Sequence, residues 1–355
     1  MNEAISRPVD EADVALLDAV HANPRASFEL LGETLGITAV TAARRWRRLT
    51  ESGRAWVSSV PGPHLAMAGA VFEIEAHPGL AAQVGRALAG LPQVVSVYLT
   101  SGEFDVHALV FAGDMAALSA LLLEEIPRVP GAARVRSHVG LEWYGGARWR
   151  LGAISTGQRA SVASDEPGTQ GPAIERTRVF DDAERDLYLA LQHDGRAGYR
   201  ELARELNTSE QQVRRRLVSM VRRGTLSFRA DFARGEGGWP VELVLWLAAP
   251  FDRLEQIGVE LGRWPETRIC MATSGSANLL VMVQLHLLQD LGHVLARLHA
   301  AHPDVQVRDQ RVVLRAVKSW GRLLDGAGHA AEVVPVNPWA APKADFPKSA
   351  GAERR

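Results

Sequence analysis

The chain contains little of what several classes of protein require. Its 355 residues include a single cysteine, Cys270, which excludes an internal disulfide framework and disfavours a structural zinc site. The N-terminal segment lacks the apolar core of a signal peptide, and no uncharged apolar run is long enough to cross a membrane. We therefore expect a soluble cytoplasmic protein without a membrane partner.

An excess of charge of one sign is also absent. The 40 Lys and Arg residues are balanced by 41 Asp and Glu residues, which leaves a formal net charge of −1. The charge of the whole chain therefore neither predicts nor excludes a nucleic-acid partner, and only local clustering of basic residues can do so.

What the chain does contain is the same plan written twice. Residues 25–53 align with residues 196–224 without a gap, and further along residues 101–102 align with residues 274–275. Each copy begins with a helical part of about 45 residues and continues with a part of about 85 residues, so one supersecondary plan is repeated.

The first part of each copy has the pattern of a helix-turn-helix, in which a short helix and a tight turn precede a capped helix. Thr38 can cap that helix in the first copy, and Ser209 and Gln212 form a capping box in the second. One face of each capped helix is apolar and is expected to pack on the preceding helices. These apolar positions are Ala42, Trp46 and Leu49 in the first copy and Val213, Leu217 and Met220 in the second.

The other face of each capped helix is rich in arginine. Residues 38–54 contain five Arg and one Glu, and residues 209–229 contain six Arg and one Glu. A guanidinium group binds phosphate or guanine, so these faces predict double-stranded DNA as a partner, with different half-sites for the two copies. The alternative is a solvated face paired with acidic residues. The candidate DNA-binding residues are Thr38, Thr41, Arg44, Arg45 and Arg48, with Ser209, Gln212, Arg215, Arg216 and Ser219.

The second part of each copy alternates strands and helices in the order β-α-β-β-α-β, which is typical of a ferredoxin-like domain. The expected fold class is α+β, with two winged helix-turn-helix domains and two ferredoxin-like (βαββαβ) effector domains in tandem. Val71, Val97 and Val110 are expected to make the open face of the sheet partly apolar. Such a face favours packing against the same face of another domain, within the chain or in a homo-oligomer.

This layout, with "SGEFD" at residues 101–105, resembles the Lrp/AsnC family of transcription regulators, named for leucine-responsive and asparagine-responsive members. The family's recognition-helix pattern is close to Ser209–Gly224, and its G-[DE]-[YF]-D turn matches Gly102–Asp105. The resemblance covers residues 11–145 well and residues 180–321 less strongly. It implies that effector domains pair face to face and that a small effector, typically an amino acid, binds at their interface.

By this resemblance, the effector site lies around the two corresponding turns. The second turn reads "GSAN" and lacks both acids, so Asn278 can form a hydrogen bond but cannot pair with an ammonium group. For Asp105, the alternative is a role in the turn alone. The candidate effector-binding residues are Ser101, Gly102, Glu103, Phe104 and Asp105, with Ser274, Gly275 and Asn278 in the second copy.

Two other classes of function compete with a regulator. The siroheme decarboxylases resemble this architecture, but their histidine-containing hairpin motif is replaced here by "SGEFDVH", with His107 already in a strand. The other class is an adaptor that does not bind DNA. The sequence contains no Ser-His-Asp, metal-ligand or phosphate-loop constellation, so we expect neither an enzyme nor a cofactor or metal site.

Composition predicts the segments between the domains. Residues 151–178 are rich in Gly, Ser, Thr and Pro, which indicates a linker, and the Ala-, Pro- and Gly-rich end of the chain indicates disorder. The expected segments are helix-turn-helix domains at 11–60 and 180–232, ferredoxin-like effector domains at 65–145 and 239–321, a linker at 146–178 and a disordered tail at 326–355.

Overall fold

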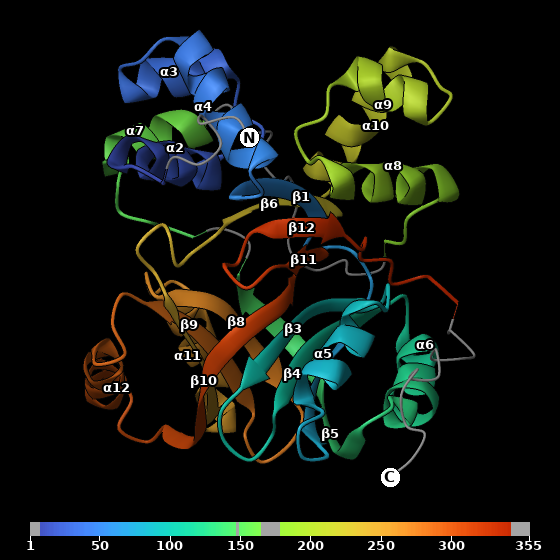
Figure 1. The fold of residues 1–355 in the computed structure, drawn as a ribbon, viewed down its shortest axis with the longest axis vertical. Helices are drawn as coiled ribbons and strands as arrows, with labels where there is room; N and C mark the ends of the chain where they lie inside the picture. The colour runs from blue at the N-terminus through green and yellow to red at the C-terminus, as the bar shows by residue number, and fades with distance from the viewer. Residues whose placement is uncertain (1–7, 147–148, 165–177, 342–355) are drawn as a thin grey trace.

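The computed structural model describes residues 8–146, 149–164 and 178–341. Two helical domains lie side by side at one end of the molecule, and a β-barrel with outer helices forms the other end (Figure 1). The α+β fold class and the tandem arrangement expected from the sequence are confirmed. Among the described residues, no helix combines the length and the apolar character needed to span a bilayer.

Each helical domain is a helix-turn-helix whose short local signals explain its shape. The tight turn needs a left-handed residue, which Gly36 (φ 68°) supplies in the first copy and Asn207 (φ 49°) in the second. Thr38 and Ser209 then cap the third helix of each domain, as the sequence predicts. The helices are α2 (Glu11–Ala22), α3 (Phe28–Leu35) and α4 (Ala39–Glu51) in the first copy, with α8 (Asp182–His193), α9 (Tyr199–Glu205) and α10 (Glu210–Arg222) in the second.

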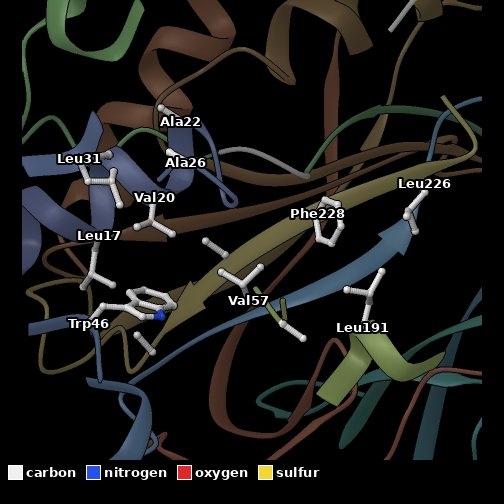
Figure 2. Close-up of a cluster of buried hydrophobic side chains, with 14 of the residues drawn as sticks. Leu17, Val20, Ala22, Ala26, Leu31, Trp46, Val57, Leu191, Leu226 and Phe228 are labelled. Atoms are coloured by element: carbon white, nitrogen blue, oxygen red, sulfur yellow. The ribbon is translucent and has the colours of Figure 1, made fainter. Parts of the chain in front are cut away.

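The two helical domains share one hydrophobic core. All six apolar positions predicted on the capped helices are buried. Figure 2 shows Leu17, Val20 and Trp46 of the first domain on one side of Val57, with Leu191 and Phe228 on the other side. The two domains are therefore packed directly against each other, in addition to being connected by the chain between them.

A two-stranded ribbon runs beneath the helical domains. Strand β1 (Ala55–Pro61) follows α4, strand β6 (Leu226–Phe232) follows α10, and the two pair antiparallel along their whole length. The strand that follows α4 thus pairs with the strand that follows α10 in the other copy, so the ribbon is not a hairpin within one copy.

The two effector sheets face each other, and their edges also join into one barrel. The strand order β10-β3-β4-β2-β5-β8-β9-β7 closes on itself because β7 pairs with β10. Helices α5 (Ala81–Ala89), α6 (Met115–Ala120), α11 (Leu254–Leu261) and α12 (Asp290–Ala301) cover the outside (Figure 1). The strands are β2 (Ala68–Ala76), β3 (Val94–Thr100), β4 (Val106–Ala112) and β5 (Ala132–Gly145), with β7 (Val241–Ala248), β8 (Thr267–Thr273), β9 (Leu279–Leu285) and β10 (Gln306–Ser319).

The long strands β5 and β10 close the barrel by crossing from one copy to the other. The first half of β5 pairs with β2 of its own copy, and its second half pairs with β8. In the same way β10 pairs first with β7 and then with β3. Of the three valines expected on the open face, Val71 lies in the barrel core, whereas Val97 and Val110 pack beneath the outer helices. The register between strands decides which face of the sheet each valine occupies, and the alternation of residues within one strand does not reveal that register.

Two segments expected to lack structure are ordered where the structure describes them. The expected linker contains helix α7 (Thr156–Ala163), which packs on α2 and α3, and a buried Trp149. The expected disordered tail forms strand β12 (Ala330–Val333), which pairs with β11 (Arg322–Leu324). Composition missed both because apolar anchors such as Trp149 pack on distant domains. Residues 165–177 and 342–355 of these segments lie outside the described residues.

Candidate nucleic-acid interface and effector site

The capped helices α4 and α10, called the reading helices from here on, expose four arginines at the same end of the molecule. Arg44 and Arg47 are exposed on α4, and Arg214 and Arg215 are exposed on α10. Within the described part of the chain, none of these four side chains forms an ion pair. Arg47 and Arg214 are absent from the sequence-based candidates, although Arg47 lies one turn after Arg44 and so shares its face.

Arg45 and Arg48 are not free in the first copy, contrary to the expectation that they face a partner. Arg45 donates to Asp10 at 3.0 Å and to Asp13 at 2.8 Å, and Arg48 pairs with the other oxygen of Asp13. Asp13 is fully buried, so these arginines neutralise a carboxylate that would otherwise be costly to bury. They hold α4 against the start of α2.

The second copy uses its acids differently. Asp181 and Glu184, which correspond to Asp10 and Asp13, also form a capping box, but Glu184 pairs with Arg223 at the end of α10. Arg216, the counterpart of Arg45, is half-buried and forms no ion pair among the described residues. The two reading faces therefore differ in which arginines are available.

The polar candidates at the helix starts serve mainly as caps. Thr38 Oγ1 accepts from the Thr41 backbone N–H at 3.1 Å, and its hydroxyl also donates to Thr41 Oγ1. Ser209 Oγ accepts from the Gln212 N–H, while Gln212 Oε1 accepts from the Ser209 N–H. Ser219 is half-buried on α10. A base contact by Gln212 would thus rely on its amide nitrogen, since its oxygen completes the capping box.

Ser101 and Ser274 form hydrogen bonds that connect the two effector domains. Ser101 Oγ accepts from the Val312 N–H at 3.0 Å, and Ser274 Oγ accepts from the Val139 N–H at 2.9 Å. These are corresponding bonds at the two seams between copies. The two predicted turns are therefore brought to the inter-copy interface, where both hydroxyls already have partners.

Asp105 and Asn278 make the same structural hydrogen bond. Asp105 Oδ2 accepts from the Ala76 N–H at 2.8 Å, and Asn278 Oδ1 accepts from the Ala249 N–H at 2.8 Å. Asn278 is buried and its amide also donates to the Ala249 carbonyl, so its polar atoms are engaged within the chain. Asp105 is half-buried and keeps one carboxylate oxygen without a hydrogen bond among the described residues.

The remaining turn candidates divide between surface and core. Gly102 and Gly275 have φ of 98° and 114°, values that favour glycine. Glu103 is exposed and accepts from Arg134 at 2.6 Å, which contributes to holding the pKa of Glu103 below its usual range. Phe104 is fully buried, and the guanidinium groups of Arg134, Arg136 and Arg311 lie over its ring. It therefore shapes the turn and cannot reach a ligand from the surface.

A buried charge network that the sequence did not reveal lies beside these turns. Glu73 Oε1 accepts from Trp246 Nε1 at 2.7 Å and pairs with Arg311 at 2.7 Å, while Glu73 Oε2 lies 3.0 Å from His138 Nε2. Burial opposes ionisation of Glu73, but His138 and Arg311 outweigh it and hold the pKa of Glu73 below its usual range. The network joins both copies inside the barrel.

His107, the histidine nearest the hairpin, is buried next to this network. Its ring lies 6.2 Å from that of Tyr98 and 6.3 Å from that of Trp246. Burial lowers the pKa of His107 to about 4, against the pull of the Glu73 charge. A neutral imidazole sealed in the barrel core is unsuited to protonate a substrate at the surface.

The fold is that of a helix-turn-helix domain followed by a βαββαβ domain, and this arrangement is present twice. The family model of the AsnC-type helix-turn-helix domain matches residues 9–50 and 180–221, and that of the Lrp/AsnC ligand binding domain matches residues 69–145. The first half therefore carries both domains of the Lrp/AsnC family and the second half carries the helix-turn-helix domain again, which fits a tandem duplication.

The relatives are about as long as one copy. An uncharacterized HTH-type transcriptional regulator of Pyrococcus abyssi is 26% identical over 150 residues, which are 42% of this chain and 94% of that protein. The HTH-type transcriptional regulator Ptr1 of Methanocaldococcus jannaschii is 29% identical over 121 residues, 33% of this chain and 82% of that protein. The crystal structure of the siroheme decarboxylase NirDL covers 87% of this chain and 93% of its own, at 14% identity and a TM-score of 0.53. That likeness concerns the fold alone.

Proposed function

We propose that this protein is a sequence-specific regulator that binds double-stranded DNA through α4 and α10, one half-site for each helix. The observation that carries the proposal is the presence of Arg44, Arg47, Arg214 and Arg215, exposed and without ion pairs, on two capped helices at one end of the molecule. A guanidinium group in this position can bind a phosphate bidentately, or donate two hydrogen bonds to a guanine in the major groove. Near-zero net charge does not oppose this, since the basic groups are locally concentrated.

The test is binding-site selection from random duplexes, followed by affinity measurements across salt concentrations. Affinity is expected to fall steeply with salt, because each neutralised phosphate releases counterions. Arg44→Ala and Arg215→Ala should each reduce the logarithmic salt slope by about 1. Arg86→Ala, which removes an exposed charge from the outer helix α5, is the matched control and should leave the slope unchanged. A flat salt response of the parent protein would refute the proposal.

We further propose that a small molecule of amino-acid type regulates the protein through the effector domain of the first copy. The match of residues 69–145 to a ligand binding domain supports this, as does the position of the turn at residues 101–105, whose Ser101 forms a hydrogen bond across the seam between copies. The second copy is the weaker candidate because Asn278 is buried and already bonded to the backbone.

Thermal-shift screening of amino acids tests this second proposal. A ligand at 100 times its Kd should stabilise the protein by about 2.7 kcal/mol. Asp105→Asn is the informative variant, since Asn278 demonstrates that an amide can keep the hydrogen bond to the strand. The variant should melt like the parent without ligand but lose the ligand-induced shift. An unchanged shift would place the pocket elsewhere.

We propose no catalytic activity, because the histidine nearest the hairpin, His107, is sealed inside the barrel. Association into homo-oligomers remains a prediction. The apolar sheet faces that motivated it cover each other within one chain, so association must use another surface. Light scattering at several protein concentrations measures it.

A further inference from the structure

In each helix-turn-helix domain, one loop accepts hydrogen bonds from an arginine of the other helix-turn-helix domain. Arg25 precedes α3 in the first domain and reaches across to the second. Its guanidinium donates two hydrogen bonds, one to the carbonyl of Gly195 and one to the carbonyl of Ala197 at 3.0 Å. Both acceptors lie in the loop between α8 and α9, so a single side chain holds that loop in place.

Arg196, the residue aligned with Arg25 in the second copy, makes the reciprocal contact. It donates to the carbonyls of Pro24 and Ala26, both at 2.6 Å. Pro24 and Ala26 flank Arg25 in the same way that Gly195 and Ala197 flank Arg196. The four hydrogen bonds therefore form a reciprocal arginine clasp, defined here as Arg25, Arg196 and the four carbonyls that they bind.

Aromatic rings complete both sides of the clasp. The guanidinium of Arg25 lies 5.3 Å from the ring centroid of Phe228, and that of Arg196 lies 4.7 Å from that of Phe28. Burial, together with the charge of Arg25, lowers the pKa of Arg196 to about 10, so Arg196 remains charged near neutral pH. Two like charges held together are unfavourable. The planar two-pronged donor of arginine, which lysine lacks, is what makes the arrangement stable.

The clasp and the ribbon hold different parts of the two domains. The β1–β6 ribbon begins directly after α4 and α10 and so fixes the C-terminal ends of the reading helices. The clasp fixes the loops that lead into α3 and α9, and it lies against the ribbon, because the Gly195 N–H donates to the Val57 carbonyl of β1 and Arg25 faces the Phe228 ring of β6. Without the clasp, the ribbon and the shared hydrophobic core would hold the two domains together, and no hydrogen bond from Arg25 or Arg196 would fix these two loops. With both attachments, the relative orientation of the two domains is set.

We infer that the Arg25–Arg196 clasp fixes the separation and angle between α4 and α10, so that one chain accepts its two half-sites at a single spacing. This inference rests on the proposed function, since it assigns a spacing rule to the same DNA-binding surface. Neither arginine contacts DNA in this role; both position the helices that do. Reading helices that dock in successive major grooves tolerate little change in separation.

The first experiment varies the DNA. The two selected half-sites are moved apart in single-base-pair steps over one helical turn of about 10 base pairs. For the parent protein, a shift of about half a turn should weaken binding on the order of 100-fold, since one helix then faces the wrong side of the duplex. For Arg25→Ala/Arg196→Ala, the same shift should cost less than about 10-fold.

Two variants separate the clasp from simple loss of charge. Arg25→Lys/Arg196→Lys keeps both positive charges but removes the forked donors, so its spacing preference should also broaden. Arg86→Ala/Arg263→Ala removes two exposed charges from the barrel surface and should keep the narrow spacing preference of the parent. If the Lys variant has the parent's preference, the forked geometry is not the cause.

The second experiment needs no DNA. Spin labels at Glu33→Cys and Arg204→Cys, exposed corresponding positions on α3 and α9, report the distance between the domains. The buried Cys270 should not react. The parent should give one narrow distance distribution, and both clasp variants a broad one. Unchanged distributions overturn the inference even if DNA binding is strong. Failure of the parent to bind DNA refutes the proposed function, while the distances still decide whether the clasp sets the geometry.

Discussion

The two copies share a frame but use corresponding charges in different ways. In the first helix-turn-helix domain, Asp13 holds Arg45 and Arg48 of the reading helix. In the second, Glu184 at the corresponding place pairs with Arg223, and Arg216 stays without an ion pair in the described structure. Two helices with similar arginine content thus present different surfaces, because the acids beneath them select which arginines remain available.

Corresponding positions of the two copies also differ in the interior of the barrel. Glu73 and His138 of the first copy correspond to Trp246 and Arg311 of the second, and all four side chains meet in one network. In a symmetric pair of identical chains, the residue at each of these positions would be the same on both sides. Duplication within one chain lets the two sides become complementary, so an acid in one copy finds its base in the other.

The largest expected effect comes from breaking this complementarity. Glu73→Ala should lower the free energy of unfolding by about 3–5 kcal/mol, because it leaves the buried Arg311 charge without its partner. Glu75→Ala, two residues along the same strand, removes an exposed pair with Arg134 and should cost at most about 1 kcal/mol. Denaturant titration of both variants measures the difference. Equal losses would show that the network does not stabilise the barrel.

A second prediction makes one position of the first copy like the second. His107 corresponds to Leu280, so His107→Leu should reduce the loss of stability at acid pH. The folded-state pKa of about 4 lies below the unfolded value of 6.5, so the parent loses stability as pH falls through this window. The loss from this group is at most about 3 kcal/mol. The exposed His77→Gln is the control, and an unchanged pH profile in His107→Leu contradicts the assignment.

A third prediction concerns the reading helices. Arg216→Ala should weaken binding at the second copy's half-site by about 1–3 kcal/mol and leave stability almost unchanged. Arg45→Ala should instead mainly lower stability, by about 1–3 kcal/mol, since buried Asp13 loses a partner. Affinity for each selected half-site and denaturant titration are measured together. Equal losses of DNA affinity in the two variants would show that the ion pairs do not decide which arginines read DNA.

The smallest expected effect is at Gln212. Its oxygen serves the capping box, so its amide nitrogen alone is available to a base, and Gln212→Ala should relax base preference by about 1 kcal/mol in one half-site only. Gln212→Glu can keep the cap acceptor while removing the donor, which separates helix stability from base contact. Binding-site selection with each variant is the measurement, with Thr41→Ala as the comparison in the other copy. Equal change at both half-sites would mean that the copies are not read separately.

The sequence by itself determined the local parts of this protein. The caps at Thr38 and Ser209, the left-handed turns and the apolar faces around Trp46 and Leu217 depend on residues within a few positions of one another. The repeat and the βαββαβ order are likewise readable along the chain, because they follow from alternation and spacing. These features sufficed to predict both domain types and the family.

Only the tertiary structure decided the partners. The pairing of Arg45 with Asp13 spans 32 residues, and that of Glu73 with Trp246 spans 173. Arg25 gives no local sign that its acceptors are carbonyls of the other domain. Such contacts are chosen by how whole domains pack, and packing depends on shape and register across the chain. The same arginine-rich pattern can therefore end as a free reading surface, a buried ion pair or a clasp between domains.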